Sequence, residues 1–341
     1  MRTTMKAWKK TLLFACLLTS FAGTAGAGNT VTDLAGRPVP VPDNVTRTAT
    51  LGAVAPINSF LFMIGRGNTI GNGLPAFFQN PYWEMQRRLE PKLAKLPVIA
   101  GSDGQPNMEA LLTMAPEVVL TSARPVAQSL ESASVPALVF EWNDFGNLMQ
   151  SAELLGKVFH DETRASQYQN YCKGNVERVT TRLAAAKEAR PRVAFLRMKT
   201  FSQPARIADW TLKTAGGDNV GLYGLQMGGQ PAMTIEILLR ADPEVLIVWS
   251  RDERDALLAD PRFASMSAVR KHQVHAVPVG ATPWLAPGVE QCLGLLWTAR
   301  QLHPTRFADL DLVHETRDFY RRFYGLAIDA KEAESILGGK N

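Results

Sequence analysis

The stretch that decides the fold is Asn107-Met-Glu-Ala-Leu-Leu-Thr-Met-Ala-Pro-Glu-Val-Val-Leu120, because the chain carries it twice. The second copy, Thr234-Ile-Glu-Ile-Leu-Leu-Arg-Ala-Asp-Pro-Glu-Val-Leu-Ile247, aligns with the first without a gap. Six positions are identical: Glu109 and Glu236, Leu111 and Leu238, Leu112 and Leu239, Pro116 and Pro243, Glu117 and Glu244, and Val118 and Val245. Two related segments this far apart in the chain predict two lobes of similar structure.

Each copy predicts one helix followed by one strand. A residue that commonly caps helices, Asn107 or Thr234, begins the copy, and the proline ends the helix. A continuous apolar run follows at 118–120 in the first copy and at 245–249 in the second. Such runs are typical of strands that are buried on both faces of a parallel sheet.

Short apolar runs alternate with helical patterns throughout both halves of the chain. We expect strands at 48–51, 98–99, 118–120 and 137–140 in the first half, and at 193–198, 245–249 and 274–277 in the second. This alternation predicts an α/β fold with mostly parallel sheets.

The residues between the halves predict helices rather than a flexible linker. Helical spacing is followed by Leu148, Ala152, Leu155, Val158 and Phe159, and again by Tyr168, Cys172, Val176, Val179 and Leu183. No proline interrupts residues 148–190. We therefore divide the chain into a signal peptide (1–27), an N-terminal α/β lobe (28–147), a connecting helical segment (148–190) and a C-terminal α/β lobe with a helical tail (191–341).

The first 27 residues have the pattern of a secretory signal peptide. A basic segment at 1–10 precedes an apolar stretch at 12–22, and Ala25-Gly-Ala27 has the A-x-A form of a cleavage site. The apolar stretch is too short to span a bilayer. A lipoprotein signal at Cys16 is the alternative, which we rank second because only five residues separate Cys16 from Lys10. We expect export to the periplasm.

The two other cysteines, Cys172 and Cys292, leave two interpretations open. An oxidising compartment permits them to form a disulfide. We favour two buried thiols, because each cysteine lies in a helical pattern.

Composition excludes some classes of function. Of 341 residues, 46% are hydrophobic and 20% are charged, as in ordinary globular proteins. The formal net charge is +5, but residues 1–27 contribute four basic groups and no acidic group. The remainder holds 33 basic and 32 acidic groups. This balance argues against nucleic-acid binding, which requires many cations to neutralise phosphates.

Motifs of common enzymes are missing from the sequence. It contains no G-x-x-x-x-G-K-[ST], no G-x-S-x-G and no C-x-x-C, and His314-Glu315 lacks the second histidine of a zincin helix. We therefore expect no catalytic residue, no cofactor and no metal site. An enzyme or metal-chelating protein that uses His272, His275 or Glu141 is the remaining alternative.

The two copies resemble segments of the periplasmic binding proteins that serve iron–siderophore and cobalamin importers of the ABC type. Thr214-Ala-Gly-Gly-Asp-Asn-Val220 and Ala268-Val-Arg-Lys-His-Gln-Val-His-Ala-Val-Pro278 add to the resemblance, which covers about residues 46–310. It implies two α/β lobes joined by one long helix, a ligand cleft between the lobes, and a monomer that delivers its ligand to a permease dimer in the inner membrane.

The same resemblance assigns a docking role to Glu109 and Glu236. In this family one glutamate from each lobe, at the matching motif position, contacts arginines of the permease. Each carboxylate here belongs to the first turn of a predicted helix, where the helix dipole favours negative charge. Two such charges at a fixed separation set the orientation of the protein on a positively charged surface.

We expect the ligand to contact loops at the carboxyl ends of the strands, as in other α/β folds. The candidate ligand-binding residues are Arg197, Trp284, Trp142, Tyr223, Phe77 and Arg124. For Arg197 the alternative is a surface ion pair, and for Trp284 it is a place in the core. Residues 74–96, which are rich in aromatic side chains, are expected to line or overhang the cleft. Arginine and tryptophan together suit a bulky, anionic, partly aromatic ligand.

An iron(III)–siderophore or similar metal complex is therefore our first expectation for the cargo. Cobalamin is an alternative, and so is molybdate or tungstate. Leu293-Gly-Leu-Leu-Trp297 and His303-Pro-Thr-Arg-Phe-Ala-Asp-Leu-Asp-Leu312 also resemble segments of relatives that bind molybdate or tungstate. Asn58-Ser59 departs from the Thr-Glu pair that many relatives carry in the first helix after the first strand.

Overall fold

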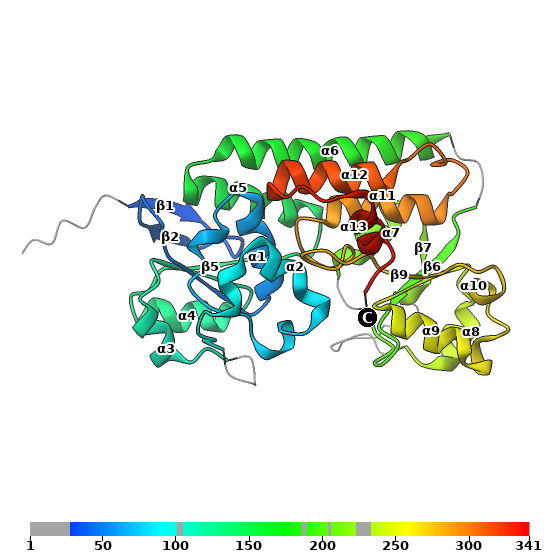
Figure 1. The fold of residues 1–341 in the computed structure, drawn as a ribbon, viewed down its shortest axis with the longest axis horizontal. Coiled ribbons are helices and arrows are strands. Elements are labelled where there is room, and N and C mark those ends of the chain that lie inside the picture. The colour runs from blue at the N-terminus through cyan, green and yellow to red at the C-terminus, as the bar shows by residue number, and fades with distance from the viewer. Residues whose placement is uncertain (1–27, 101–104, 186–188, 204–205, 223–232, 341) are drawn as a thin grey trace, which may run out of the picture.

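The computed structural model describes residues 28–340 except 101–104, 186–188, 204–205 and 223–232. Two α/β lobes lie side by side, and one long helix, α6 (Glu162–Ala184), runs along both of them (Figure 1). The predicted signal peptide, Cys16 and Tyr223 lie outside the described residues. Within them, no helix is both long and apolar enough to cross a membrane.

The N-terminal lobe is built on a three-stranded parallel sheet in the order β3-β4-β5. Its strands are β3 (Thr48–Leu51), β4 (Val118–Thr121) and β5 (Ala137–Val139). An antiparallel pair, β1 (Asn29–Thr32) and β2 (Pro38–Val41), lies beside it. The helices of this part of the chain are α1 (Val54–Met63), α2 (Glu84–Leu89), α3 (Met108–Met114), α4 (Arg124–Ser132) and α5 (Phe145–Phe159).

The C-terminal lobe has a four-stranded parallel sheet in the order β7-β6-β8-β9. Its strands are β6 (Arg192–Leu196), β7 (Asp218–Asn219), β8 (Val245–Val248) and β9 (Val274–Ala276). Its helices are α7 (Ile207–Thr214), α8 (Ile235–Ala241), α9 (Arg251–Ala259), α10 (Ser267–Arg270) and α11 (Gln291–Leu302). The tail adds α12 (Leu312–Phe319), a π-helical turn (Tyr320–Tyr324) and α13 (Ala330–Leu337).

Both apolar runs of the duplicated segment form central strands, as the sequence predicts. All residues of β4 and β8 are buried, because each strand is covered on both faces. The predicted strand at 98–99 is wrong. Val98 is 41% exposed, and the nearest pairing is an isolated bridge between Ala100 and Pro106. A residue that faces solvent gains little from a strand conformation, and the preceding Pro97 has no N–H group to donate.

The helical segment between the sheets consists of two helices. His160 ends α5 in a left-handed conformation with φ of 53°, and the Asp161 side chain then caps α6 by accepting from the Arg164 N–H. Helix α6 packs on α5 and also on α11. This single helix therefore contacts elements that come before and after it in the chain.

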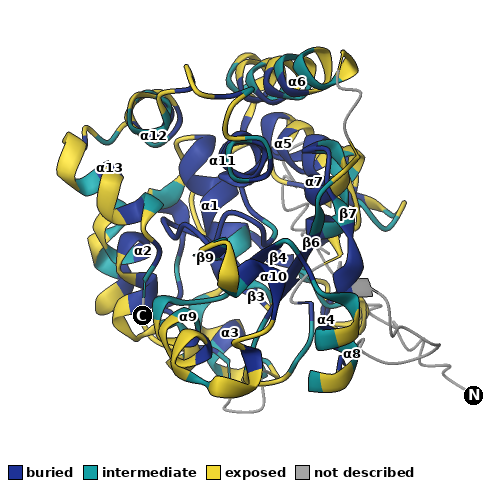
Figure 2. Ribbon diagram, turned by 90° about the vertical axis from the view of Figure 1, so that its right-hand side faces the viewer, coloured by how far each residue is buried: buried dark blue, intermediate teal, exposed yellow. Residues whose placement is uncertain are grey.

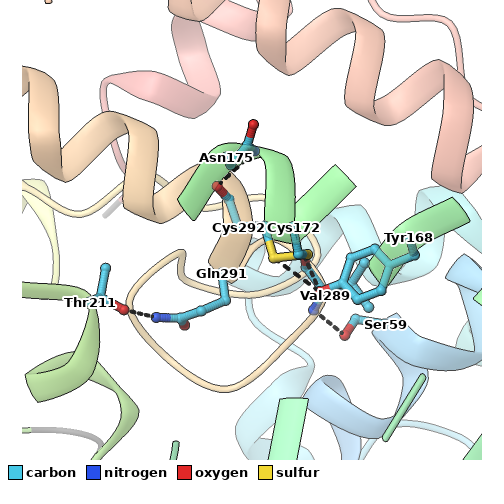
Figure 3. The surroundings of a disulfide bond; sticks show 8 residues. All are labelled: Ser59, Tyr168, Cys172, Asn175, Thr211, Val289, Gln291 and Cys292. Atoms are coloured by element: carbon cyan, nitrogen blue, oxygen red, sulfur yellow. Dashed lines mark hydrogen bonds between the residues drawn. A yellow bond between two sulfur atoms is a disulfide. The ribbon is translucent and has the colours of Figure 1, made fainter. Parts of the chain in front are cut away.

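A disulfide joins α6 to α11 through Cys172 and Cys292 (Figure 3). Beside it, the Tyr168 hydroxyl donates to the Val289 carbonyl, and the Asn175 amide donates to the Cys292 carbonyl. Our preference for two buried thiols is wrong. Helical spacing correctly placed both cysteines on helices, but only the packing of α6 against α11 brings their Cα atoms to 5.2 Å.

The main hydrophobic core runs through both lobes and beneath the helical layer. It includes Phe60, Trp284 and Phe319, none of which has exposed surface. Helix α11 lies in the middle of it and is buried along almost its whole length (Figure 2). The tail packs on this core through Phe319, Tyr320 and Phe323.

Candidate functional site

The duplicated segment gives α3 and α8 the same N-terminal geometry. The Asn107 side chain accepts from the Ala110 N–H at 3.0 Å, and the Thr234 hydroxyl accepts from the Ile237 N–H at 3.3 Å. Glu109 and Glu236 follow in the first turns, and both are exposed. A hydrogen bond from Thr234 lowers the pKa of Glu236.

The two glutamates lie on one side of the molecule. In Figures 1 and 2, α3 and α8 are both at the end of the molecule opposite α6, one in each lobe. The structure therefore presents two exposed carboxylates at equivalent positions of the two lobes.

The lobes contact each other through Tyr82 and Trp249. The Tyr82 hydroxyl donates to the Trp249 carbonyl at 3.1 Å, and the two rings stack with centroids 5.9 Å apart. Burial raises the pKa of Tyr82 well above its usual value, so its hydroxyl stays protonated and remains a donor. Tyr82 belongs to the aromatic segment that was expected to line the cleft, and Trp249 directly follows strand β8.

A buried amide makes a second contact between the lobes. Gln86 on α2 has no exposed surface and donates to the carbonyls of Ala55 at 3.1 Å and Ala281 at 2.7 Å. Ala55 is in the first turn of α1, which follows β3, and Ala281 follows β9, so segments at the carboxyl ends of both sheets meet at this amide. This is the edge where α/β folds usually hold ligands.

Arg197, which directly follows β6, lies against Trp249 at the same edge. Its guanidinium carbon is 3.8 Å from the centre of the Trp249 ring, within the range of a cation–π contact. Burial lowers the pKa of Arg197, and nearby Tyr82 and Glu253 oppose that effect. The Glu253 carboxylate accepts from the N–H groups of Met198 and Trp249 instead.

The half-buried cation of Arg197 has no counter-ion within the described residues. None of their carboxylates lies within 4.0 Å of it, and its buried Nε makes no hydrogen bond. The alternative of a surface ion pair for Arg197 is therefore not found in this part of the chain. A half-buried charge without a counter-ion is costly, and an unsatisfied buried N–H group requires an explanation.

Three further buried N–H donors near strand ends make no hydrogen bond in the structure. They are Nε1 of Trp142 after β5, Nε of Arg251 after β8 and Nε1 of Trp284 after β9. Three acceptor-capable groups on helices are also unpartnered: the Asn58 carbonyl oxygen and the hydroxyls of Tyr171 and Tyr324. The four unpartnered arginine and tryptophan atoms are all donors, and those of Arg197, Arg251 and Trp142 come within three residues of a strand end.

The other predicted contacts are in different surroundings. Trp284 has no exposed surface and is part of the core, whereas Trp142 is 9% exposed and stacks on Phe60. Phe77 is 59% exposed and packs against Phe78 and Trp83. Arg124 is exposed and forms an ion pair with Glu141 at 2.6 Å.

The structure brings Arg197 together with Tyr82 and Trp249, neither of which is among the six candidate ligand-binding residues. The available signals were the position of Trp249 at the end of a predicted strand and that of Tyr82 in an aromatic segment. Neither signal shows that the two residues meet across the lobes.

The histidine alternative has no support in the described residues. The His275 ring packs on Trp297 and hydrogen-bonds to the Gln273 side chain at 3.1 Å, and burial lowers its pKa to about 4. His272 lies in a turn, with φ of 55°. In the described ranges, no three histidine, cysteine or carboxylate side chains are close enough together to hold a metal ion.

Comparison with known proteins identifies relatives of this chain. A family model described as "Periplasmic binding protein" matches residues 80–279. The molybdate-binding protein MolA of Haemophilus influenzae is 28% identical over 351 aligned positions, which cover 92% of this chain and 96% of the relative.

Solved structures share the fold. A periplasmic solute binding protein from Veillonella parvula superposes with a TM-score of 0.78 at 23% identity, covering 91% of this chain and 96% of that one. The structure of MolA bound to molybdate superposes with a TM-score of 0.75 at 21% identity, covering 88% of this chain and 99% of that one. CeuE of Helicobacter pylori with Ni(II) bound superposes with a TM-score of 0.73 at 20% identity, covering 91% of this chain and 99% of that one. With the family model matching more than half of its length and two α/β lobes joined along α6, this chain belongs to the periplasmic binding protein family.

Proposed function

We propose that this periplasmic binding protein is the solute-binding subunit of an ABC importer and that its cargo is a small oxyanion of the molybdate or tungstate type. It binds the cargo between the lobes and releases it to the permease without chemical change. The family membership supports a periplasmic location, and we include export by the 1–27 segment and a monomeric state in the proposal.

The observation that carries the cargo assignment is the set of unpartnered donors after the strands. The guanidinium groups of Arg197 and Arg251 and the indole group of Trp142 donate hydrogen bonds and accept none. A metal oxyanion at neutral pH is negatively charged, and all of its oxygens accept. It therefore complements a donor-rich, positively charged edge better than a neutral ligand does.

Sequence similarity supports the same cargo. The relative that is 28% identical over nearly the whole chain is described as a molybdate-binding protein. The segments at 293–297 and 303–312, which resemble relatives that bind molybdate or tungstate, lie in and after α11.

Contact between the lobes also favours a compact cargo. Tyr82 bonds to the Trp249 carbonyl and stacks on its ring, so a bulky chelate enters between these lobes only after the two side chains separate. A tetrahedral oxyanion requires a much smaller opening.

The second candidate is an iron(III)–siderophore or cobalamin, and the exposed aromatic cluster favours it. Phe77, Phe78 and Trp83 pack together with centroid separations of 4.8–6.1 Å, and Phe77 is the most exposed large apolar side chain described. An exposed aromatic surface of this kind suits a large, flat organic ligand.

Isothermal titration calorimetry with the purified mature chain separates these candidates. The panel is molybdate, tungstate, sulfate, a ferric catecholate, a ferric hydroxamate and cyanocobalamin, with tryptophan fluorescence as a second readout. We expect saturable one-to-one binding of molybdate and tungstate, with sulfate weaker. Tight binding of a ferric siderophore or of cobalamin, without oxyanion binding, would replace the proposed cargo with the second candidate.

For delivery, we propose that Glu109 and Glu236 contact the permease dimer. Both carboxylates are exposed, each belongs to a different lobe, and both lie on the side opposite α6 (Figure 1). Their separation is fixed by the lobes, so together they orient the protein as well as attract it.

A further inference from the structure

The C-terminal segment after α13 ends at the carboxyl edge of the C-terminal sheet. The Ile336 carbonyl accepts a hydrogen bond from the Val279 N–H at 3.2 Å, and the Lys340 carbonyl accepts one from the Arg251 N–H at 2.9 Å. Gly339 lies between these two anchors with φ of 76°. A Cβ atom at that position would lie 2.8 Å from the Ala276 Cβ and 2.9 Å from the Val277 carbonyl oxygen. The last described residues are thus held against the ends of β9 and α9.

The same segment also reaches the N-terminal lobe. Glu332 on α13 forms an ion pair with Arg88 on α2. The neighbouring Arg87 donates to the carbonyls of Phe78, Gln79 and Asn80 and forms no ion pair with a described residue. Figures 1 and 2 show the end of the described chain beside α9 and near α2. The tail therefore lies where the two lobes meet.

Lys340 is half-buried in this position. The charged groups that act on its amine are Glu84 and Arg87 of α2, Arg251 of α9, and Glu290. The Glu290 carboxylate is already occupied, because it accepts from Tyr320, Ala281 and Thr282. In the part of the chain that the structure describes, neither Lys340 nor Arg251 forms an ion pair, and the buried Nε of Arg251 makes no hydrogen bond.

We propose that Lys340 is an anion-binding residue of the cleft, contributed by the C-terminal tail and acting with Arg251 on the oxyanion. This inference rests on the proposed function and adds a residue to the same site. The hydrogen bond from the Arg251 N–H to the Lys340 carbonyl holds the backbones of the two residues together, and the close packing at Gly339 leaves the tail little freedom to leave the edge. Two cations that form no ion pair with the described residues stabilise a small dianion more than either of them alone.

The test is molybdate affinity in a set of tail variants. Lys340→Gln removes the charge, Lys340→Arg retains it, and Lys331→Gln removes a charge from the exposed face of α13 in the same tail. We expect Lys340→Gln to raise the Kd about tenfold, the usual size of one charged hydrogen bond. Lys340→Arg should restore the affinity to within about threefold of the parent, and Lys331→Gln should leave it unchanged. Thermal melting of each variant checks that the fold is intact.

Three results would overturn the assignment, and they are distinguishable from one another. If the parent chain binds molybdate and Lys340→Gln binds it equally well, Lys340 is outside the site while the proposed function stands. If the parent binds neither molybdate nor tungstate, the proposed cargo and the role of Lys340 both fail. An equal loss in Lys340→Gln and Lys331→Gln would indicate a general effect of net charge and would also overturn the proposal.

Discussion

Arg47 and Arg192 make the same set of bonds in the two lobes. The Arg47 Nε donates to the Ala115 carbonyl at 2.8 Å, and the Arg192 Nε donates to the Asp242 carbonyl at 3.1 Å. The backbone N–H of each arginine also donates to the carboxylate of the glutamate that follows the motif proline. This glutamate is Glu117 in the N-terminal lobe, at 2.9 Å, and Glu244 in the C-terminal lobe, at 3.2 Å. The duplication that is visible in the sequence therefore extends to tertiary contacts outside the two matching segments.

The left-handed residues that end α3 and α8 give a prediction about stability. Ala115 has φ of 48° and Asp242 has φ of 40°, a conformation that favours glycine. Ala115→Gly should raise the free energy of unfolding by about 0.5–1 kcal/mol, because glycine adopts this conformation without strain. Chemical denaturation of the parent and of the variant measures this change in the free energy of unfolding.

Asp242→Gly is the matched control for that substitution. The Asp242 carboxylate accepts from the Ser267 N–H and from its hydroxyl, both at 2.7 Å. Glycine removes both bonds, so we expect no gain in stability and a net loss. A gain in both variants would show that the Ser267 contacts contribute little.

Arg197→Gln should weaken oxyanion binding without weakening the fold. A charged hydrogen bond to the cargo is worth about 1.5–3 kcal/mol, which is about 10- to 150-fold in Kd. The cation has no counter-ion in the described residues, so its removal should leave the melting temperature unchanged or raise it.

Calorimetry and thermal melting together check this expectation. The control is Arg182→Gln, in which the replaced arginine forms two bonds with Asp309 on an exposed face. An unchanged Kd in Arg197→Gln, with binding by the parent intact, would remove Arg197 from the site.

The double variant Glu109→Ala with Glu236→Ala should abolish uptake while cargo affinity stays intact. Both carboxylates are exposed, and neither α3 nor α8 carries a residue proposed for the cargo site, so their loss should change the docking surface only. Uptake of labelled cargo by cells that lack the native gene measures delivery, and calorimetry measures affinity. Glu177→Ala, at an exposed position of α6, is the control and should support normal uptake. Normal uptake in the double variant would dismiss the docking role.

Removal of the disulfide should destabilise the protein without altering the cargo site. The bond closes a loop with a sequence separation of 120, for which we expect a loss of about 2–5 kcal/mol in the Cys172→Ser, Cys292→Ser variant. A reducing agent should lower the melting temperature of the parent and leave that of the variant unchanged. Two free thiols in the unfolded, unreduced mature chain would contradict the bond.

Stability should fall as the pH is lowered from about 6.5 to about 4. Burial lowers the pKa of His275 from 6.5 to about 4, so in this range the unfolded chain takes up a proton that the folded chain does not. The contribution is fully present above pH 6.5 and is lost towards pH 4, with an upper size of about 3 kcal/mol. Unfolding by denaturant at several pH values measures it, and His275→Gln should flatten this part of the profile. An equally steep profile in that variant would assign the effect to other groups.

Local pattern predicted much of the fold. The strands at 48–51, 118–120 and 245–249 and the helices after Asn107 and Thr234 were predictable because burial on both faces and capping depend on residues close together in sequence. The strand at 98–99 was not, because the exposure of Val98 depends on what covers it.

The sequence by itself determined that the chain has two related α/β lobes with one carboxylate at each matching helix start, since a repeated local pattern folds in the same way wherever it occurs. Tertiary structure alone decided that Cys172 meets Cys292, that Arg197 lies on Trp249 without a counter-ion, and that Lys340 reaches the start of α9. Each of these pairs is brought together by the packing of whole elements, and no periodicity in the chain encodes which buried faces will meet.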